Sequence, residues 1–125
     1  MVSRIAQLTI DVHDIDSMSR FWSEALGMIA DVGDDGACKL YPPEDAEKWR
    51  QTIWLQPVEE TKRDKLRLHL DLRPEEGDTE REVERLVGLG AARADVGQTG
   101  EEGFTVLADP EGNEFCVLSR PVQDV

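Results

Sequence analysis

The sequence is short of cysteine and of positive charge, and it contains no long hydrophobic run. Its only two cysteines, Cys38 and Cys116, have a spacing that resembles neither a disulfide framework nor a zinc knuckle. The N-terminal residues alternate polar and apolar side chains, unlike a signal peptide or a membrane-spanning segment. We therefore expect a cytoplasmic protein whose two thiols are reduced.

Basic residues are scarce relative to acidic ones. The chain has 14 Lys and Arg against 27 Asp and Glu, which gives a formal net charge of -13. Such a surface repels nucleic-acid phosphates and anionic lipid headgroups, so we expect no nucleic-acid partner and no membrane partner. With 125 residues, 39% of them hydrophobic, the chain is long enough for one folded domain with a core of its own.

Several sequence signatures of catalysis are also missing. We find no Gly-rich phosphate loop, no nucleophile elbow and no paired-carboxylate arrangement. The function therefore has to be inferred from the arrangement of strands and helices and from single side chains on them.

The sequence does contain two successive patterns of strand and helix. Alternation over residues 5–12 predicts a strand, and helical spacing from Met18 to Leu26 predicts a helix that ends at Gly27. The pattern restarts with a strand at 66–73 and a helix at 79–89 that ends before Gly90. Shorter strands complete each half, at 28–32, 37–41 and 51–57 and then at 92–96, 103–107 and 114–119.

The two halves match each other at a nearly constant offset. Leu26-Gly27 matches Leu89-Gly90 at an offset of 63, and Trp54-Leu55 matches Cys116-Val117 at 62. The match predicts an α+β fold of two tandem βαβββ units, residues 5–58 and 65–119, within a single domain over 1–125. We expect the strands to curl into a partly open, cup-shaped mixed sheet with the helices outside.

The strand at 66–73 is predicted to have two different faces. Four leucines alternate with Arg67, His69, Asp71 and Arg73. We expect the leucine face to pack under the helices, so that the polar face lines the cup or its rim.

Three motifs together resemble a known superfamily. They are the Leu-Gly helix ends, the strand Leu68-His69-Leu70-Asp71-Leu72, and the turn Ala108-Asp109-Pro110-Glu111-Gly112-Asn113 before a hydrophobic strand. Over residues 5–119 the chain resembles the vicinal oxygen chelate superfamily, and within it the glyoxalase-like, bleomycin-resistance-type proteins. The resemblance implies a small-molecule ligand in the cup and a homodimer.

Enzymes of that superfamily hold a divalent metal with ligands from the first and last strand of each unit. The resemblance places these positions at Gln7, Trp54, His69 and Cys116, with Gln56 as an alternative to Trp54. Only His69 is a strong neutral ligand, Trp54 cannot bind a metal, and the soft Cys116 stands where relatives have a glutamate. Because this set lacks a carboxylate, we predict no metal; if one binds, Gln7, His69 and Cys116 would hold it.

The resulting hypothesis is metal-free binding or sequestration of a small organic ligand. Its predicted binding residues are Gln7, Trp54, Gln56, Arg67, His69, Asp71 and Cys116. Two enzymatic alternatives remain open: a glyoxalase-type lyase or isomerase that uses a divalent metal at His69, and metal-free acid–base chemistry by His69 with Asp71.

Several of these residues also have ordinary structural interpretations. His69 can be hydrogen-bonded across the sheet, and Cys116 can be a small buried hydrophobe. Trp54 can stack on a planar ligand or simply fill the cup. The insertion at 42–50, with Trp49, can form a lid or a loop anchored to the sheet.

Overall fold

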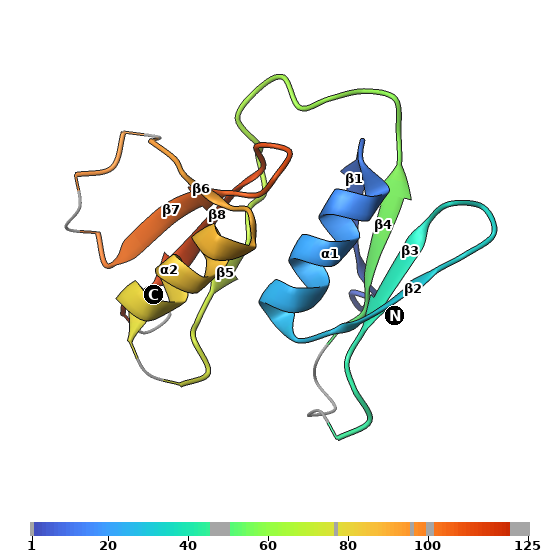
Figure 1. The fold of residues 1–125 in the computed structure, drawn as a ribbon, viewed down its shortest axis with the longest axis horizontal. Coiled ribbons are helices and arrows are strands. Elements are labelled where there is room, and N and C mark those ends of the chain that lie inside the picture. The colour runs from blue at the N-terminus through green and yellow to red at the C-terminus, as the bar shows by residue number, and fades with distance from the viewer. Residues whose placement is uncertain (1, 46–50, 77, 96, 100–101, 121–125) are drawn as a thin grey trace. The chain divides into compact units, whose positions relative to one another are not determined.

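The chain forms two compact units, residues 1–61 and 62–125, each with one helix and one four-stranded sheet (Figure 1). The computed structural model describes residues 2–45, 51–76, 78–95, 97–99 and 102–120. Both units have the element order β-α-β-β-β, which confirms the α+β class and the repeat. Within the described ranges, no helix has the length and apolar character needed to cross a membrane.

The first unit contains a mixed sheet in the order β1-β4-β3-β2. Strands β1 and β4 are parallel, whereas β3 is antiparallel to both β4 and β2. The elements are β1 (Leu8–Val12), α1 (Ile15–Leu26), β2 (Ile29–Val32), β3 (Cys38–Tyr41) and β4 (Ile53–Pro57).

Helix α1 is fixed at both ends by local interactions. The side chain of Asp14 accepts a hydrogen bond from the backbone N–H of Ser17 at 3.1 Å, and Gly27 ends the helix with φ 63°. The buried face of α1 packs on β2, β3 and β4. That face consists mainly of Met18, Phe21, Trp22 and Ala25, and it meets the buried strand residues Cys38, Leu40, Ile53 and Leu55.

The second unit repeats this arrangement in the order β5-β8-β7-β6, with β5 parallel to β8. Helix α2 has the predicted bounds, begins after Asp78 and ends before Gly90. On this helix, Val83 and Leu86 are buried, but Val87 is exposed. The elements are β5 (Asp71–Leu72), α2 (Thr79–Leu89), β6 (Ala92–Arg93), β7 (Phe104–Ala108) and β8 (Glu114–Leu118).

The predicted strand at 66–73 is wrong over most of its length, because only Asp71 and Leu72 are in β5. Leu68 is 82% exposed and does not pack under a helix. The register explains the difference: Asp71 pairs with Cys116, so residues before 69 would have to pair with the turn that precedes β8. A turn has no extended backbone with which a strand could pair. The alternation in the sequence does not show where the neighbouring strand begins.

That turn is built around the buried carboxylate of Asp109. Its Oδ1 accepts hydrogen bonds from the backbone N–H groups of Glu111 at 3.0 Å and Asn113 at 2.9 Å. Its Oδ2 accepts a further one from Nδ2 of Asn113 at 2.9 Å. Gly112 takes a φ of 88°, as a tight turn of this kind requires.

Two predicted segments extend beyond the described residues. The insertion at 42–50 is described only as far as Asp45, so the prediction of a lid or an anchored loop lies outside the described residues, as does Trp49. The predicted strand at 92–96 is observed as Ala92–Arg93, and Val96 also lies outside the described residues.

Candidate functional site

Three of the predicted site residues come together in the second unit. Asp71 and Cys116 are direct partners in the parallel pairing of β5 with β8, and His69 precedes Asp71 by two residues. Nε2 of His69 lies 3.3 Å from Oδ1 of Asp71. One possible ligand atom from each of the three residues lies within 4.8 Å of the other two. We call these residues the His69–Asp71–Cys116 cluster.

The cluster combines a buried thiol with two accessible polar side chains. Cys116 is only 7% exposed, while the side chains of His69 and Asp71 are 42% and 40% exposed. A ligand can therefore reach the imidazole and the carboxylate from solvent, and Cys116 forms the inner side of the cluster.

The thiol of Cys116 is held in its protonated form. Burial, then the negative charge of Asp71, and then the hydrogen bond from the thiol to that carboxylate raise its pKa to about 11. The positive charges of Lys65 and Arg120 act in the opposite direction but are smaller causes. At neutral pH Cys116 is therefore a hydrogen-bond donor rather than a free nucleophile.

The donor set of this cluster differs from the one expected from the family positions. Asp71 was not among those positions, but it adds a carboxylate to the imidazole of His69 and the sulfur of Cys116. Imidazole, carboxylate and thiolate together are ligands that zinc accepts, whereas manganese and magnesium favour oxygen ligands. The cluster thus fits a thiophilic divalent ion. The prediction that no metal binds rested on the lack of a carboxylate, and the cluster contains one.

The first unit contributes a second pair of predicted residues, on the face of its sheet opposite α1. Nε1 of Trp54 donates a hydrogen bond to Oε1 of Gln56 at 3.0 Å. This bond fixes the indole ring and leaves the amide nitrogen of Gln56 for a ligand. Thr9 is the direct strand partner of Trp54, and Gln7 is exposed just before β1.

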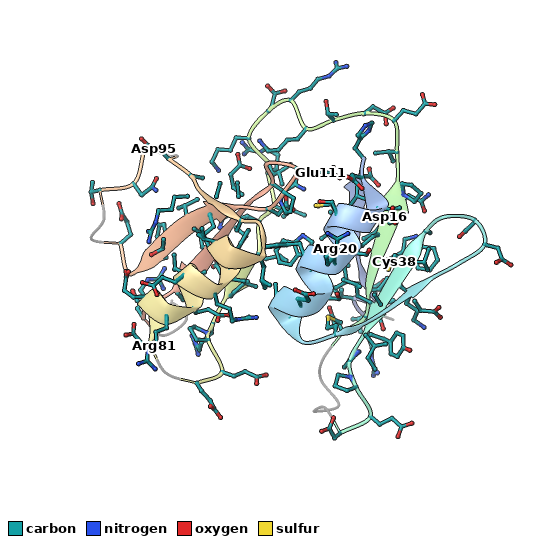
Figure 2. The ribbon with its side chains drawn as sticks, viewed as in Figure 1. Asp16, Arg20, Cys38, Arg81, Asp95 and Glu111 are labelled. Carbon is teal, nitrogen blue, oxygen red and sulfur yellow. The ribbon has the colours of Figure 1, made fainter. Side chains whose placement is uncertain are left out.

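The remaining predicted positions are less constrained. Arg67 is exposed on the segment that precedes β5. The expected metal set of Gln7, His69 and Cys116 draws on both units, and it stays a prediction. Cys38 comes from β3 of the first unit, where burial raises the pKa of its thiol (Figure 2). Its position under α1 makes it a core residue rather than a site residue.

One charged residue beside the cluster was not predicted. Glu114 lies on β8 two residues before Cys116, and its Oε1 is 2.9 Å from Nζ of Lys62. Burial alone would raise the pKa of Glu114, but hydrogen bonds, first of all from Lys62, and the charge of that lysine hold it below the ordinary value. Its position two residues from Cys116 was the only signal in the sequence, because its partner Lys62 lies far away along the chain, between the two repeats.

The described residues also form an open hollow of about 540 Å³ at the start of α2. Its lining includes Asp78, Gly103 and Phe104 but no residue of the cluster. We therefore place the candidate site at the His69–Asp71–Cys116 cluster, where the chemically capable side chains are, and not at this hollow.

Comparison with solved structures supports the architecture. The fosfomycin resistance protein FosX from Mesorhizobium loti is similar with a TM-score of 0.72 and 14% identity, over 98% of this chain and 95% of that chain. A glyoxalase/bleomycin resistance protein/dioxygenase family enzyme from Burkholderia phytofirmans PsJN gives a TM-score of 0.65 and 17% identity, over 90% and 94% of the chains. A FosX mutant from Listeria monocytogenes, complexed with Mn(II) and a dihydroxypropylphosphonic acid, gives 0.70 and 13%, over 98% and 94%.

These similarities agree with the fold described above, two units of the element order β-α-β-β-β. A family model described as the glyoxalase-like domain matches residues 7–118. The chain therefore belongs to the glyoxalase-like domain family. No curated protein sequence matches it significantly.

Proposed function

We propose that this protein binds a small organic ligand at the His69–Asp71–Cys116 cluster. The proposal rests on one observation: an imidazole, a carboxylate and a thiol, with ligand atoms within 4.8 Å of one another, converge where β5 pairs with β8. Together they offer hydrogen-bond donors and acceptors of the kind that orient a polar ligand. Binding or sequestration needs no catalytic residue, and the proposal assigns none.

For the first unit taken by itself, the polar pair of Trp54 and Gln56 supports binding of a planar ligand. The hydrogen bond between Trp54 and Gln56 holds the indole ring in one orientation, and a fixed ring loses little conformational entropy when a ligand stacks on it. Gln7 and Arg67 remain proposed contacts because both are exposed. We also infer, from the family resemblance, that the chain forms a homodimer, which sedimentation would test.

A screen of small planar and polar molecules by thermal unfolding, with a chelator present, tests this proposal. A ligand that binds only the folded state at about 100 times its dissociation constant should stabilise it by roughly 2.7 kcal/mol. We expect the shift to be lost in His69→Ala and kept in His13→Ala, the other histidine of the chain. A hit whose shift survives in His69→Ala would place binding elsewhere.

A second candidate function is a glyoxalase-type lyase or isomerase that requires a divalent metal. The observation that favours it is the presence of Asp71 in the cluster, because it adds a carboxylate to His69 and Cys116. A bound ion supplies a Lewis acid that polarises a carbonyl oxygen. In this function the three side chains hold the ion, and the exposed imidazole and carboxylate leave the outer side of the site open to a substrate.

A further inference from the structure

The charges that act on Cys116 differ in balance from those of the chain as a whole. Acidic residues outnumber basic ones by 27 to 14 in the sequence. Burial is the largest cause of the raised pKa of Cys116, and the negative charge of Asp71 raises it further, while the positive charges of Lys65 and Arg120 lower it. Two of these three charges are therefore positive, in a chain with nearly twice as many acids as bases.

Arg120 is held in place by contacts with the start of β7. Its Nε donates a hydrogen bond to the backbone carbonyl oxygen of Glu102 at 3.0 Å, and its Cζ lies 5.9 Å from the centre of the Phe104 ring. Its aliphatic part lies beside Gly103, where an added Cβ would be 2.7 Å from Cδ of Arg120. These contacts fix the direction of the guanidinium, so it loses little side-chain entropy when it binds a ligand.

The aromatic ring beneath Arg120 is on the same face of the sheet as Cys116. Phe104 of β7 is the direct partner of Leu118 of β8, and residues directly opposite each other share a face. Leu118 follows Cys116 by two residues on β8, and this spacing returns a side chain to the same face. The guanidinium of Arg120 therefore lies on the face of the sheet that carries the thiol.

Lys65 is placed beside the cluster by the segment that leads to β5. It is exposed and precedes His69 by four residues. Nζ of Lys62, three residues earlier, lies 2.9 Å from the carboxylate of Glu114, which precedes Cys116 by two residues on β8. This ion pair holds the segment against β8. It also neutralises Glu114, so this acid does not offset the positive charge of Lys65.

We propose that the ligand of the His69–Asp71–Cys116 cluster is a small organic anion whose negative group binds Arg120 and Lys65. The inference rests on the proposed function, because it adds the charge of the ligand at the same cluster. A guanidinium and an ammonium bind a carboxylate through charge-assisted hydrogen bonds. Asp71 repels a negative group, so this group lies toward Arg120 and Lys65, and the uncharged part of the ligand lies toward the imidazole and the carboxylate of the cluster.

Alkylation of Cys116 by two reagents tests the inference, because iodoacetate is a small organic anion and iodoacetamide is its neutral counterpart of similar shape. In both reactions the sulfur displaces iodide, so the ratio of the two rates cancels the effects of burial and of the thiol pKa. The Cys38→Ala variant leaves Cys116 as the only thiol. In this background we expect Lys65→Gln and Arg120→Gln each to lower the ratio of iodoacetate to iodoacetamide rates by roughly twofold at low salt, the Coulomb effect of a unit charge about 8 Å away in water. The drop should disappear at about 1 M salt, where the Debye length is about 3 Å.

Variants that keep the charge, or remove one elsewhere, are the controls. Lys65→Arg and Arg120→Lys keep the positive charge and should keep the ratio of rates. Arg81→Gln removes an exposed positive charge from α2 of the same unit and should leave the ratio unchanged. If Arg120→Gln does not fold by circular dichroism, Lys65→Gln, at an exposed position, carries the test.

Two results would overturn the inference. One is a ratio of rates that stays the same when the charge of Lys65 or Arg120 is removed, and the other is an equal drop in Arg81→Gln. The measurement needs no hit from the ligand screen, so the two proposals fail separately. An unchanged ratio leaves a hit from the screen standing, and a screen without a hit overturns the proposed function whatever the ratio is.

Discussion

Nζ of Lys62 lies 2.9 Å from Oε1 of Glu114, and each of the two side chains is only 16% exposed. The second carboxylate oxygen of Glu114 is buried and has no hydrogen-bond partner among the described residues. Lys62 therefore carries most of the compensation for placing this carboxylate in a poorly solvated position. The pair ties the segment between the two repeats to the first residue of β8.

Lys62→Met should destabilise the protein more than Glu114→Gln. The first substitution leaves a buried carboxylate without its counter-ion, at a cost of roughly 1–3 kcal/mol, while the second removes the charge and keeps the shape. Urea unfolding of both variants at neutral pH measures the difference. Equal losses would show that the ion pair itself contributes little.

The same pair predicts a pH dependence. Because the pKa of Glu114 is lowered in the folded state, its contribution to stability is present above the ordinary value of 4.5 and is lost as the pH falls below it. The stability difference between wild type and Lys62→Met should therefore shrink as the pH falls below that value. A difference that stays constant down to strongly acidic pH would contradict the assignment.

Alkylation of Cys116 should be slow at neutral pH and should accelerate toward its raised pKa of about 11. Mass spectrometry after iodoacetamide treatment of the Cys38→Ala variant measures the alkylation of this thiol alone, because the variant lacks the other cysteine. Asp71→Asn should move the rate profile to lower pH without restoring the ordinary value of 9.0, because burial is the larger cause. A profile unchanged by this substitution would show that Asp71 does not act on the thiol.

Cys116 also predicts a loss of stability at high pH. The unfolded chain ionises this thiol near 9.0, before the folded chain does, so stability falls as the pH rises from 9.0 toward 11. Cys116→Ala should remove this part of the alkaline destabilisation, as urea unfolding across that range would show. The same decline in both proteins would assign it to other groups.

Asp109→Ala should destabilise the turn before β8 by about 2–4 kcal/mol, because it leaves two backbone N–H groups of a partly buried turn without their acceptor. Asp109→Asn keeps one side-chain oxygen and should cost less. Thermal unfolding of the two variants gives the comparison. A smaller loss for alanine than for asparagine would show that the carboxylate does not organise the turn.

Gly103→Ala should cost more than Gly36→Ala. Both glycines have a positive φ, 83° and 85°, so both substitutions carry a backbone cost of roughly 1–2 kcal/mol. At Gly103 the new Cβ would also lie 2.7 Å from Cδ of Arg120, whereas at Gly36 no atom lies within 4 Å. Arg120 would have to leave its position over the ring of Phe104. Unfolding midpoints of the two variants isolate this steric contribution, and equal midpoints would exclude it.

The features that the sequence predicted well are those decided by neighbouring residues. Helix α2 has the predicted bounds because its amphipathic period and the Gly90 stop are local. The strand at 66–73 failed because pairing depends on where β8 begins, and β8 begins only after the turn held by Asp109. Local alternation carries no information on that distant start.

The sequence indicated which residues belong to the candidate site but not how they lie relative to one another. His69, Asp71 and Cys116 were each singled out, yet only the register of β5 with β8 places Asp71 beside the sulfur. Glu114 was missed because its role depends on Lys62, and nothing in the sequence near Lys62 marks it as a partner. Both omissions concern side chains that are distant in the sequence and adjacent in space.

Because the chain contains two copies of one unit, the side chains at equivalent positions of the two copies can be compared directly. Thr9 pairs with Trp54 in the first sheet, and Asp71 pairs with Cys116 at the equivalent place in the second, 62 residues further on. The same parallel strand pair thus carries an aromatic ring in one copy and a thiol with a carboxylate in the other. The strand register is therefore the same in both copies, although the side chains at this position differ completely in size and chemistry.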